Sequence, residues 1–310
     1  MEVVSSILDL VGNTPLLDLS RILPEGSARV LAKLEMYNPG GSIKDRPAMA
    51  MIEAAERDGL LKPGMTIVEP TAGNTGIGLA LVGNLKGYRT VFFVPDRMSA
   101  EKIMSMKLYG AEVVLVPKEV GMKGCIQQAK DYTDAADERF MPQQFENPAN
   151  PGQAETRLGP EIYQQLGAYP DGIALGAGSG GTFTGLARWM RANNKDGKCW
   201  LVQPEGSIFD GGEPGNYQIE GIGNSFIPET LKLDLADFIA TIPDQRSFDR
   251  CKQLSREFGL LGGGSCGANL EASAELALQL GPGKTVVTIF SDALERYISK
   301  DWVQNLANEE

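Results

Sequence analysis

The sequence predicts an α/β protein of two domains, each built on a mostly parallel, twisted sheet flanked by helices. Two observations predict this class. Short runs rich in β-branched residues alternate with amphipathic helical stretches, which is typical of a parallel sheet covered by helices. The chain also has 310 residues, which is enough for two such domains.

In the first half, a helix at 46–59 follows a Pro-Gly-Gly turn, and three strands then alternate with three helices. The strands are expected at 66–70, 91–95 and 112–117, and the helices at 74–86, 99–109 and 122–137. The short connections between them predict right-handed βαβ crossovers.

The second half repeats this alternation after residues 143–153, which are rich in Pro, Asn and Gln and are interpreted as the return between the domains. Strands are expected at 172–175, 199–203, 238–242 and 285–290, with helices through residue 189 and near 246–258 and 267–280. The stretch 204–230 has little periodicity, and irregular segments of that length are usually functional.

Composition and charge describe an ordinary globular protein and exclude several function classes. Apolar residues make up 42% of the chain and charged residues 22%, while 29 basic against 40 acidic residues give a net charge of −11. An acidic chain without a basic cluster argues against nucleic-acid binding. No apolar run is long enough to cross a bilayer, and the N-terminus lacks the basic start of a secretory signal, so we expect no membrane contact.

Cysteine and histidine usage narrows the chemistry further. The four cysteines have no C-x-x-C spacing, which indicates reduced, mostly buried thiols of a cytoplasmic protein. The chain has no histidine, which excludes Ser-His-Asp and Cys-His mechanisms and any zinc site that uses imidazole, and we expect no metal. Proton transfer must therefore use lysine, a carboxylate, tyrosine, cysteine or a bound cofactor.

One lysine is placed as a candidate nucleophile. Lys44 lies in NPGGSIKDR (38–46), at the first turn of the expected helix, where the unpaired N–H groups and the helix dipole disfavour a positive charge. A partly desolvated amine there should lose its proton more easily than a surface lysine. Taken alone, a solvated lysine near a helix start is the commoner case.

Three stretches, at 69–80, 176–185 and 262–269, each contain a polar, glycine-rich turn between an apolar run and an expected helix. Backbone N–H groups at such helix starts suit a carboxylate or a phosphate, although each turn could simply be a capped helix N-terminus. The second turn also satisfies G-x-G-x-x-G, but its position in the second half and the lack of a convincing acidic partner disfavour a dinucleotide fold. Three such turns, one amine and no histidine favour a phosphorylated aldehyde cofactor bound to the lysine.

Seven motifs occur in order along nearly the whole chain: PGGSIKDR (39–46), EPTAGNTGIG (69–78), QQFENPANP (143–151), GAGSGGTFTG (176–185), QIEGIGNSFIP (218–228), GSCGA (264–268) and SDALERYISK (291–300). Together they resemble the pyridoxal-phosphate-dependent cysteine synthase/cystathionine β-synthase family. The resemblance implies the tryptophan-synthase-β-like fold, known as fold type II, with pyridoxal 5′-phosphate between two domains. The large cofactor-binding domain comprises 1–40 plus 150–310, and the small mobile domain, 41–149, carries the substrate-carboxylate loop.

The resemblance also implies a role for individual residues. Lys44 forms the internal aldimine and then removes and returns the substrate α-proton. Asn74 bonds the cofactor's ring hydroxyl, and Ser265 faces the pyridine nitrogen, where a neutral serine leaves the ring a weaker electron sink than a carboxylate would. The phosphate is held by Gly178, Ser179, Gly180, Gly181 and Thr182. The substrate carboxylate is held by Thr71, Ala72, Gly73, Asn74, Thr75 and Gln144.

The expected reaction is β-replacement on O-acetyl-L-serine or L-serine through an aminoacrylate, with homocysteine as the thiol and L-cystathionine as the product. TAGNTG (71–76), PEGSI (204–208) and DGGEP (210–214) make the chain more similar to the bacterial O-acetylserine-dependent cystathionine β-synthase branch. Cysteine synthesis from sulfide and consumption of cysteine with release of hydrogen sulfide stay open. An NAD-dependent dehydrogenase is a remote alternative that would leave Lys44 dispensable.

The chain departs from the family pattern at three places. Ala72 stands where cysteine synthases commonly have serine, Cys266 replaces a serine and is interpreted as core filling, and Ala293-Leu294 replace a small polar pair. The resemblance implies small amino acids as substrates and a homodimer as the assembly.

Overall fold

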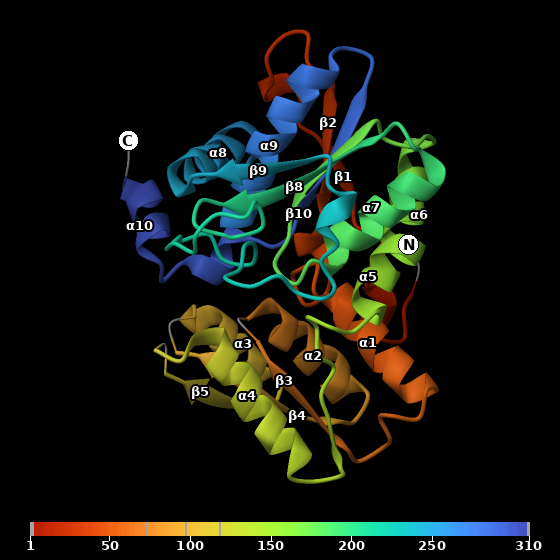
Figure 1. The fold of residues 1–310 in the computed structure, drawn as a ribbon, viewed down its shortest axis with the longest axis vertical. Coiled ribbons are helices and arrows are strands. Elements are labelled where there is room, and N and C mark those ends of the chain that lie inside the picture. Colours follow the sequence, from red (N-terminus) through yellow and green to blue (C-terminus); the bar gives the residue numbers. More distant parts are fainter. Residues whose placement is uncertain (1–2, 72, 97, 118, 309–310) are drawn as a thin grey trace.

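The computed structural model describes residues 3–71, 73–96, 98–117 and 119–308, which contain two sheets with helices on their faces (Figure 1). The larger sheet has the strand order β1-β2-β10-β7-β8-β9. Its strands are β1 (Leu16–Asp18), β2 (Arg29–Leu34), β7 (Gly172–Gly176), β8 (Lys198–Pro204), β9 (Phe238–Ile242) and β10 (Thr285–Phe290). The β1–β2 pair is antiparallel and the other pairs of this sheet are parallel.

The smaller sheet is wholly parallel and has the order β5-β4-β3-β6. Its strands are β3 (Thr66–Pro70), β4 (Arg89–Pro95), β5 (Glu112–Val116) and β6 (Arg139–Phe140). The α-helices of the described residues are α1 (Asp45–Arg57), α2 (Asn74–Leu85), α3 (Ala100–Leu108), α4 (Gly121–Asp134), α5 (Ala149–Gln153), α6 (Gly159–Leu166), α7 (Gly181–Asn193), α8 (Asp244–Phe258), α9 (Gly264–Leu280) and α10 (Asp301–Asn308). Within this part of the chain, no helix is both long and apolar enough to cross a membrane.

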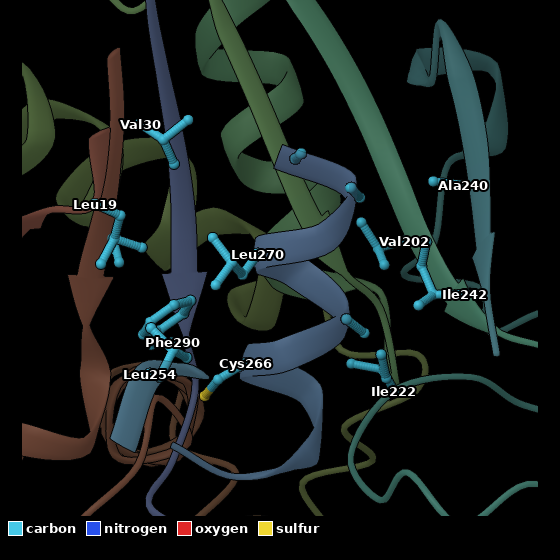
Figure 2. Packing of buried hydrophobic residues seen from close by; sticks show 14 of the residues in the cluster. Leu19, Val30, Val202, Ile222, Ala240, Ile242, Leu254, Cys266, Leu270 and Phe290 are labelled. Carbon is cyan, nitrogen blue, oxygen red and sulfur yellow. The ribbon is translucent and has the colours of Figure 1, made fainter. Parts of the chain in front are cut away.

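Both faces of the larger sheet are buried under helices. Successive side chains of a strand point to opposite faces, so neighbouring residues pack in different clusters. Ala174 of β7 packs in one cluster with Leu270 of α9, whereas its neighbours Ile173 and Leu175 pack in a second cluster with Phe183 of α7. Figure 2 shows α9 with Leu270 and Cys266 packed against side chains of the first cluster. The sheet is thus held between α8 and α9 on one face and the layer containing α7 on the other.

Both faces of the smaller sheet are also covered by helices. Ile67 and Phe92 pack in the cluster that contains residues of α1 and α2, while Val68 and Phe93 pack with Cys125 and its neighbours on α4. The fold class expected from the alternating pattern is therefore confirmed, and each expected strand lies within one or two residues of an observed one. The domain boundaries at 41 and 149 stay a prediction.

The structure differs from the sequence-based expectation in the segment taken as an irregular return. Residues 149–153 form α5 and continue through a π-helical turn at 154–158 into α6. The prolines of this segment do not prevent the helix, because Pro148 precedes α5 and Pro151 lies in its first turn, where no N–H donor is required. The residues 205–232 are irregular up to a short 3₁₀ turn, as the lack of periodicity predicted.

Candidate active site

Lys44 lies at the N-terminal cap of α1, half-buried in the wall of two adjoining cavities. The residues before Lys44 are fixed beside the end of β10. Ile43 N–H donates a hydrogen bond to the Ser291 carbonyl (2.9 Å), and Ser42 and Asp292 form a β-bridge. Burial lowers the pKa of the Lys44 amine, and the nearby Asp292 carboxylate partly opposes this shift. The amine is therefore easier to deprotonate than that of a surface lysine.

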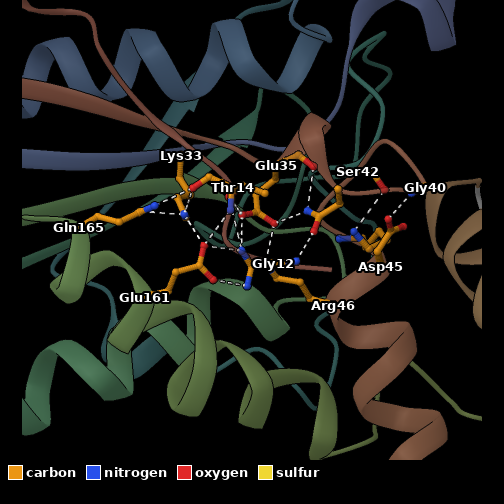
Figure 3. Close-up of polar contacts among 12 residues, drawn as sticks. Gly12, Thr14, Lys33, Glu35, Gly40, Ser42, Asp45, Arg46, Glu161 and Gln165 are labelled. Carbon is orange, nitrogen blue, oxygen red and sulfur yellow. Dashed lines mark hydrogen bonds and ion pairs between the residues drawn. The ribbon is translucent and has the colours of Figure 1, made fainter. Parts of the chain in front are cut away.

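A buried charge network anchors the helix that carries this lysine (Figure 3). Arg46 of α1 pairs with Glu35 and Glu161, and Lys33 of β2 also pairs with Glu161. All four side chains are at least nine-tenths buried, and two cations face two anions. The network joins α1, β2 and α6, so it fixes the start of α1 against the larger sheet.

The glycine-rich turn before α7 forms a cradle of backbone atoms. Gly178, Ser179, Gly180 and Thr182 line the inner cavity, and the first N–H groups of a helix have no partner within the helix. Gly180 has φ +85°, and a side chain on Gly178 would overlap the carbonyl oxygen of Gly221. A cradle of this kind suits a phosphate.

Side chains from other segments hold this cradle in place. The Asn150 amide donates to the Ser179 hydroxyl (3.0 Å) and to the backbone carbonyl of Gln144 (2.8 Å). The Asn224 amide donates to the Gly178 carbonyl (3.0 Å). Sequence reasoning did not single out these two asparagines, although both lie inside quoted motifs.

Asn74, Ser265 and Asp292 also line the inner cavity. The Asn74 amide and the Tyr297 hydroxyl both donate to one oxygen of Asp292, each at 2.6 Å, and Arg296 donates to the Asn74 oxygen at 3.1 Å. Asp292 is 1% exposed, and its second oxygen has no hydrogen-bond partner within the described residues. Sequence reasoning missed Asp292, which follows the carboxyl end of β10 by two residues, a position that could have indicated it.

The predicted carboxylate loop faces the outer cavity. Thr71, Gly73, Asn74, Thr75 and Gln144 all line it, whereas Ala72 lies outside the described residues. The Thr71 hydroxyl accepts N–H groups of Gly73 and Gly76 (3.1 Å each), so it caps the start of α2. The Thr75 hydroxyl donates to the side-chain oxygen of Gln144 (2.7 Å), and Glu69 accepts the backbone N–H of Gln144 (2.9 Å).

The outer cavity has a volume of about 580 Å³ and shares Lys44, Asn74 and Glu220 with the inner one. The irregular segment 205–232 supplies more of its lining residues than any other segment, and α3 and the start of α10 also line it. This segment was expected to be functional because of its length, and it lies where a second ligand would approach Lys44.

The residues present fit pyridoxal phosphate. A half-buried amine suits its aldehyde, a backbone cradle at a helix start suits its phosphate, and the Asn74 and Ser265 side chains supply neutral polar groups in the wall of the same cavity. The four thiols are unsuited to compete as nucleophiles because all are buried, and burial raises the pKa of each.

Comparison with known proteins agrees with this geometry. The chain is 44% identical to a cysteine synthase of Staphylococcus aureus over 298 residues (96% of each chain), and 44% identical to an O-acetylserine dependent cystathionine beta-synthase of Bacillus subtilis over 301 residues (97% and 98%). It superimposes on the crystal structure of the O-acetylserine dependent cystathionine beta-synthase from Helicobacter pylori with a TM-score of 0.92 and 40% identity, covering 97% and 99% of the two chains. Residues 7–292 match the family described as pyridoxal-phosphate dependent enzyme, and this chain belongs to that family.

Proposed function

We propose that this protein catalyses pyridoxal-phosphate-dependent β-replacement on O-acetyl-L-serine, or L-serine, with homocysteine as the thiol and L-cystathionine as the product. The observation that carries the proposal is that Lys44 lies where two cavities meet, one lined by the glycine cradle and the other by the carboxylate loop. An amine at this junction reaches both a bound cofactor and the α-carbon of an amino acid.

Each group of residues has a separate task in the proposed reaction. When bound, pyridoxal phosphate supplies the electron sink that stabilises negative charge at the substrate α-carbon. Lys44 holds the cofactor and then moves the α-proton, a task for which its lowered pKa suits it. The cradle at Gly178–Thr182 binds the phosphate, Asn74 orients the ring, and Ser265 offers a neutral hydroxyl.

The carboxylate loop orients the substrate. Thr75, Gln144 and the N–H groups at the start of α2 hold the substrate carboxylate, because a helix N-terminus with adjacent hydroxyl and amide groups binds anions. Holding the carboxylate there directs the Cα–H bond toward Lys44. The leaving group then departs into the outer cavity, from which the thiol enters.

The outer cavity favours an amino-acid thiol over sulfide as the second substrate. The chain is equally identical to a cysteine synthase and to a cystathionine beta-synthase, so sequence identity does not separate the two activities. A volume of about 580 Å³ with polar and charged walls is far larger than sulfide needs and accommodates a second amino acid.

We further propose that the protein works in the cytoplasm as a homodimer. The four free, buried cysteines suit a reducing compartment, and the family resemblance supports the dimer.

A competition assay tests the proposed reaction. Purified protein receives O-acetylserine with equimolar sulfide and homocysteine, and the products are quantified by mass spectrometry. We expect mostly cystathionine. Mostly cysteine would make the protein a cysteine synthase, and neither product would direct the test to serine or cysteine as the donor.

A second measurement separates this chemistry from that of a dehydrogenase. The holoenzyme should absorb visible light through its lysine-bound cofactor, and borohydride should remove that absorption. Lys44→Ala should abolish turnover and leave the circular dichroism spectrum unchanged. Full activity in this variant would overturn the proposal.

A further inference from the structure

Two oppositely charged side chains from different parts of the fold meet in the outer cavity. Lys102 of α3, beside the smaller sheet, and Glu220 of the irregular segment 205–232 both line it, and their Nζ and Oε2 atoms are 2.8 Å apart. The Lys102 side chain is 2% exposed and that of Glu220 is 15% exposed. Neither residue has a role in the site described above.

Each member of the pair has a second partner. The other carboxylate oxygen of Glu220 lies 2.9 Å from the Lys300 ammonium, and the Lys102 ammonium lies 4.0 Å from the centre of the Tyr297 ring. Burial alone would raise the pKa of the Glu220 carboxyl, but Lys102 and Lys300 outweigh it and hold the pKa below its usual range. The Glu220 carboxyl is therefore ionised at neutral pH.

A buried ion pair is a costly way to join two parts of a fold. The desolvation of both charges consumes most of their mutual attraction, and apolar side chains of similar volume usually stabilise a contact as well or better. The pair also faces a cavity rather than packed core, since both side chains contribute to its wall. Charges in such a position are available to a ligand that brings one of each sign.

The second substrate of the proposed reaction, an amino-acid thiol, is a ligand with one charge of each sign. Glu220 lines the inner as well as the outer cavity, so a group bound to the pair lies within reach of the reacting centre at Lys44. Sulfide carries neither an ammonium nor a carboxylate and gains nothing from the pair. An amino-acid thiol carries both, so its carboxylate can pair with Lys102 and its ammonium with Glu220 in place of the ion pair between them.

We propose that Lys102 and Glu220 are specificity-determining residues that bind the carboxylate and the α-ammonium of the incoming amino-acid thiol. This inference rests on the proposed β-replacement and deepens it by assigning the recognition of its second substrate. The pair opens when the thiol binds, and Lys300 stays beside Glu220 as the substrate ammonium joins it.

The test compares two thiols within one holoenzyme. Initial rates are measured with O-acetylserine and either L-homocysteine or sulfide, and kcat/KM for homocysteine is divided by kcat/KM for sulfide. In Lys102→Met and Glu220→Gln this ratio should fall about tenfold or more, because a charge-assisted hydrogen bond to the larger thiol is lost. Lys102→Arg, which keeps the charge, should recover most of the ratio.

Glu101→Gln is the matched control. Glu101 also joins α3 to the C-terminal segment, through the backbone N–H (2.7 Å) and hydroxyl (2.8 Å) of Ser299, but it belongs to neither cavity wall. If the Lys102–Glu220 pair acted only by fastening α3 to neighbouring segments, loss of the Glu101 contact would lower the ratio to a similar extent. We expect the control to keep the parent ratio.

A binding measurement adds a readout that does not depend on turnover. L-Homocysteine is titrated calorimetrically into holoenzyme whose lysine–cofactor bond has been reduced with borohydride, so that the first-substrate site cannot react. The Kd should rise about tenfold or more in Lys102→Met and Glu220→Gln and stay at the parent value in Glu101→Gln.

The outcomes separate this inference from the proposed function. If the parent protein turns over neither O-acetylserine nor L-serine, the proposed function fails and the inference fails with it. If either donor is turned over but the thiol ratio and the homocysteine Kd are unchanged in both cavity variants, the inference alone is overturned. An equal loss in Glu101→Gln also overturns it, because a structural clasp would then explain the effect.

Discussion

The guanidinium of Arg46 binds the carboxylate of Glu161 through two parallel hydrogen bonds, at 2.8 and 3.0 Å, in a region almost closed to solvent. Arg46 lies two residues after Lys44 in the chain, whereas Glu161 belongs to α6. The pair therefore attaches the helix that begins at Lys44 to a distant part of the chain. A bidentate pair fixes orientation as well as position.

Glu161→Gln should destabilise the protein strongly. The substitution leaves Arg46 and Lys33 with one anion, Glu35, and an uncompensated buried charge costs about 3–5 kcal/mol. Urea unfolding of the cofactor-free protein measures the change. Glu155→Gln is the control, because its pair with Arg188 is exposed and 3.9 Å long, and its loss should cost less than about 1 kcal/mol. Similar costs for both variants would contradict the assigned role of the network.

Asp292→Asn should shift the pH at which the cofactor-free protein captures pyridoxal phosphate. The Asp292 carboxylate raises the pKa of the Lys44 amine against the lowering effect of burial, so a neutral amide should let this pKa fall further. Because the neutral amine is the reactive form, the rate of capture should reach its plateau at a lower pH than in the parent.

The rise of cofactor absorbance after mixing, measured from pH 6 to 10, gives the profile. Asp301→Asn removes a carboxylate from the wall of the outer cavity and should leave the profile in place. A shift toward higher pH in Asp292→Asn would mean that the carboxylate does not act on Lys44 through its charge.

Gly178→Ala should weaken cofactor binding by about tenfold or more, because the new methyl group overlaps the Gly221 carbonyl and must displace the cradle. Absorbance titration of cofactor-free protein with pyridoxal phosphate measures the affinity. Gly152→Ala is the matched control, since an added Cβ in α5 meets no atom within 4 Å. The control should keep the parent affinity and gain up to about 1 kcal/mol of helix stability.

Glu69 should make the stability of the protein depend on pH. Burial raises the pKa of its carboxyl from 4.5 to about 8, despite the N–H groups that Gln143 and Gln144 donate to it. Between these values the folded chain keeps a proton that the unfolded chain releases. The free energy of unfolding should therefore fall, because of this group, as the pH rises from about 4.5 through 8, by at most about 1.4 kcal/mol per pH unit.

Urea unfolding of the parent and of Glu69→Gln at pH 5, 6, 7 and 8 isolates this contribution. Glutamine can accept only one of the two N–H groups, which lowers stability by an amount independent of pH. The difference between the two proteins should change in favour of the variant as the pH rises. Parallel curves would show that Glu69 is already ionised in the folded chain.

The sequence predicted the buried parallel strands well because such strands read as continuous β-branched runs, as in β4 and β10. It missed β2, where Lys33 interrupts the apolar pattern. That lysine is buried only because Glu161 lies opposite it, and the two residues are 128 positions apart. A local pattern carries no information about such a partner.

In the candidate site, too, local sequence signals could be recognised and contacts between distant residues could not. Lys44 and the three glycine-rich turns could be found because each is a local signal, and the structure gathers them around the two cavities. Glu220 could not, because its partner Lys102 lies 118 positions away. Asp292 has a local signal in its position after β10, but its contact with Asn74, 218 positions away, could not be foreseen. The assigned roles of the individual site residues stay predictions until the variants are measured.

The Asn150 amide connects the two loops to which we assign the binding of the phosphate and of the substrate carboxylate. It bonds Ser179 of the phosphate cradle and the backbone of Gln144, whose side chain bonds Thr75 of the carboxylate loop. A substrate that tightens this chain of contacts strengthens the grip on the cofactor, and reciprocity requires the cofactor to raise the affinity for substrate by the same factor. If the assigned roles hold, cofactor retention and substrate capture are one cooperative property of the protein.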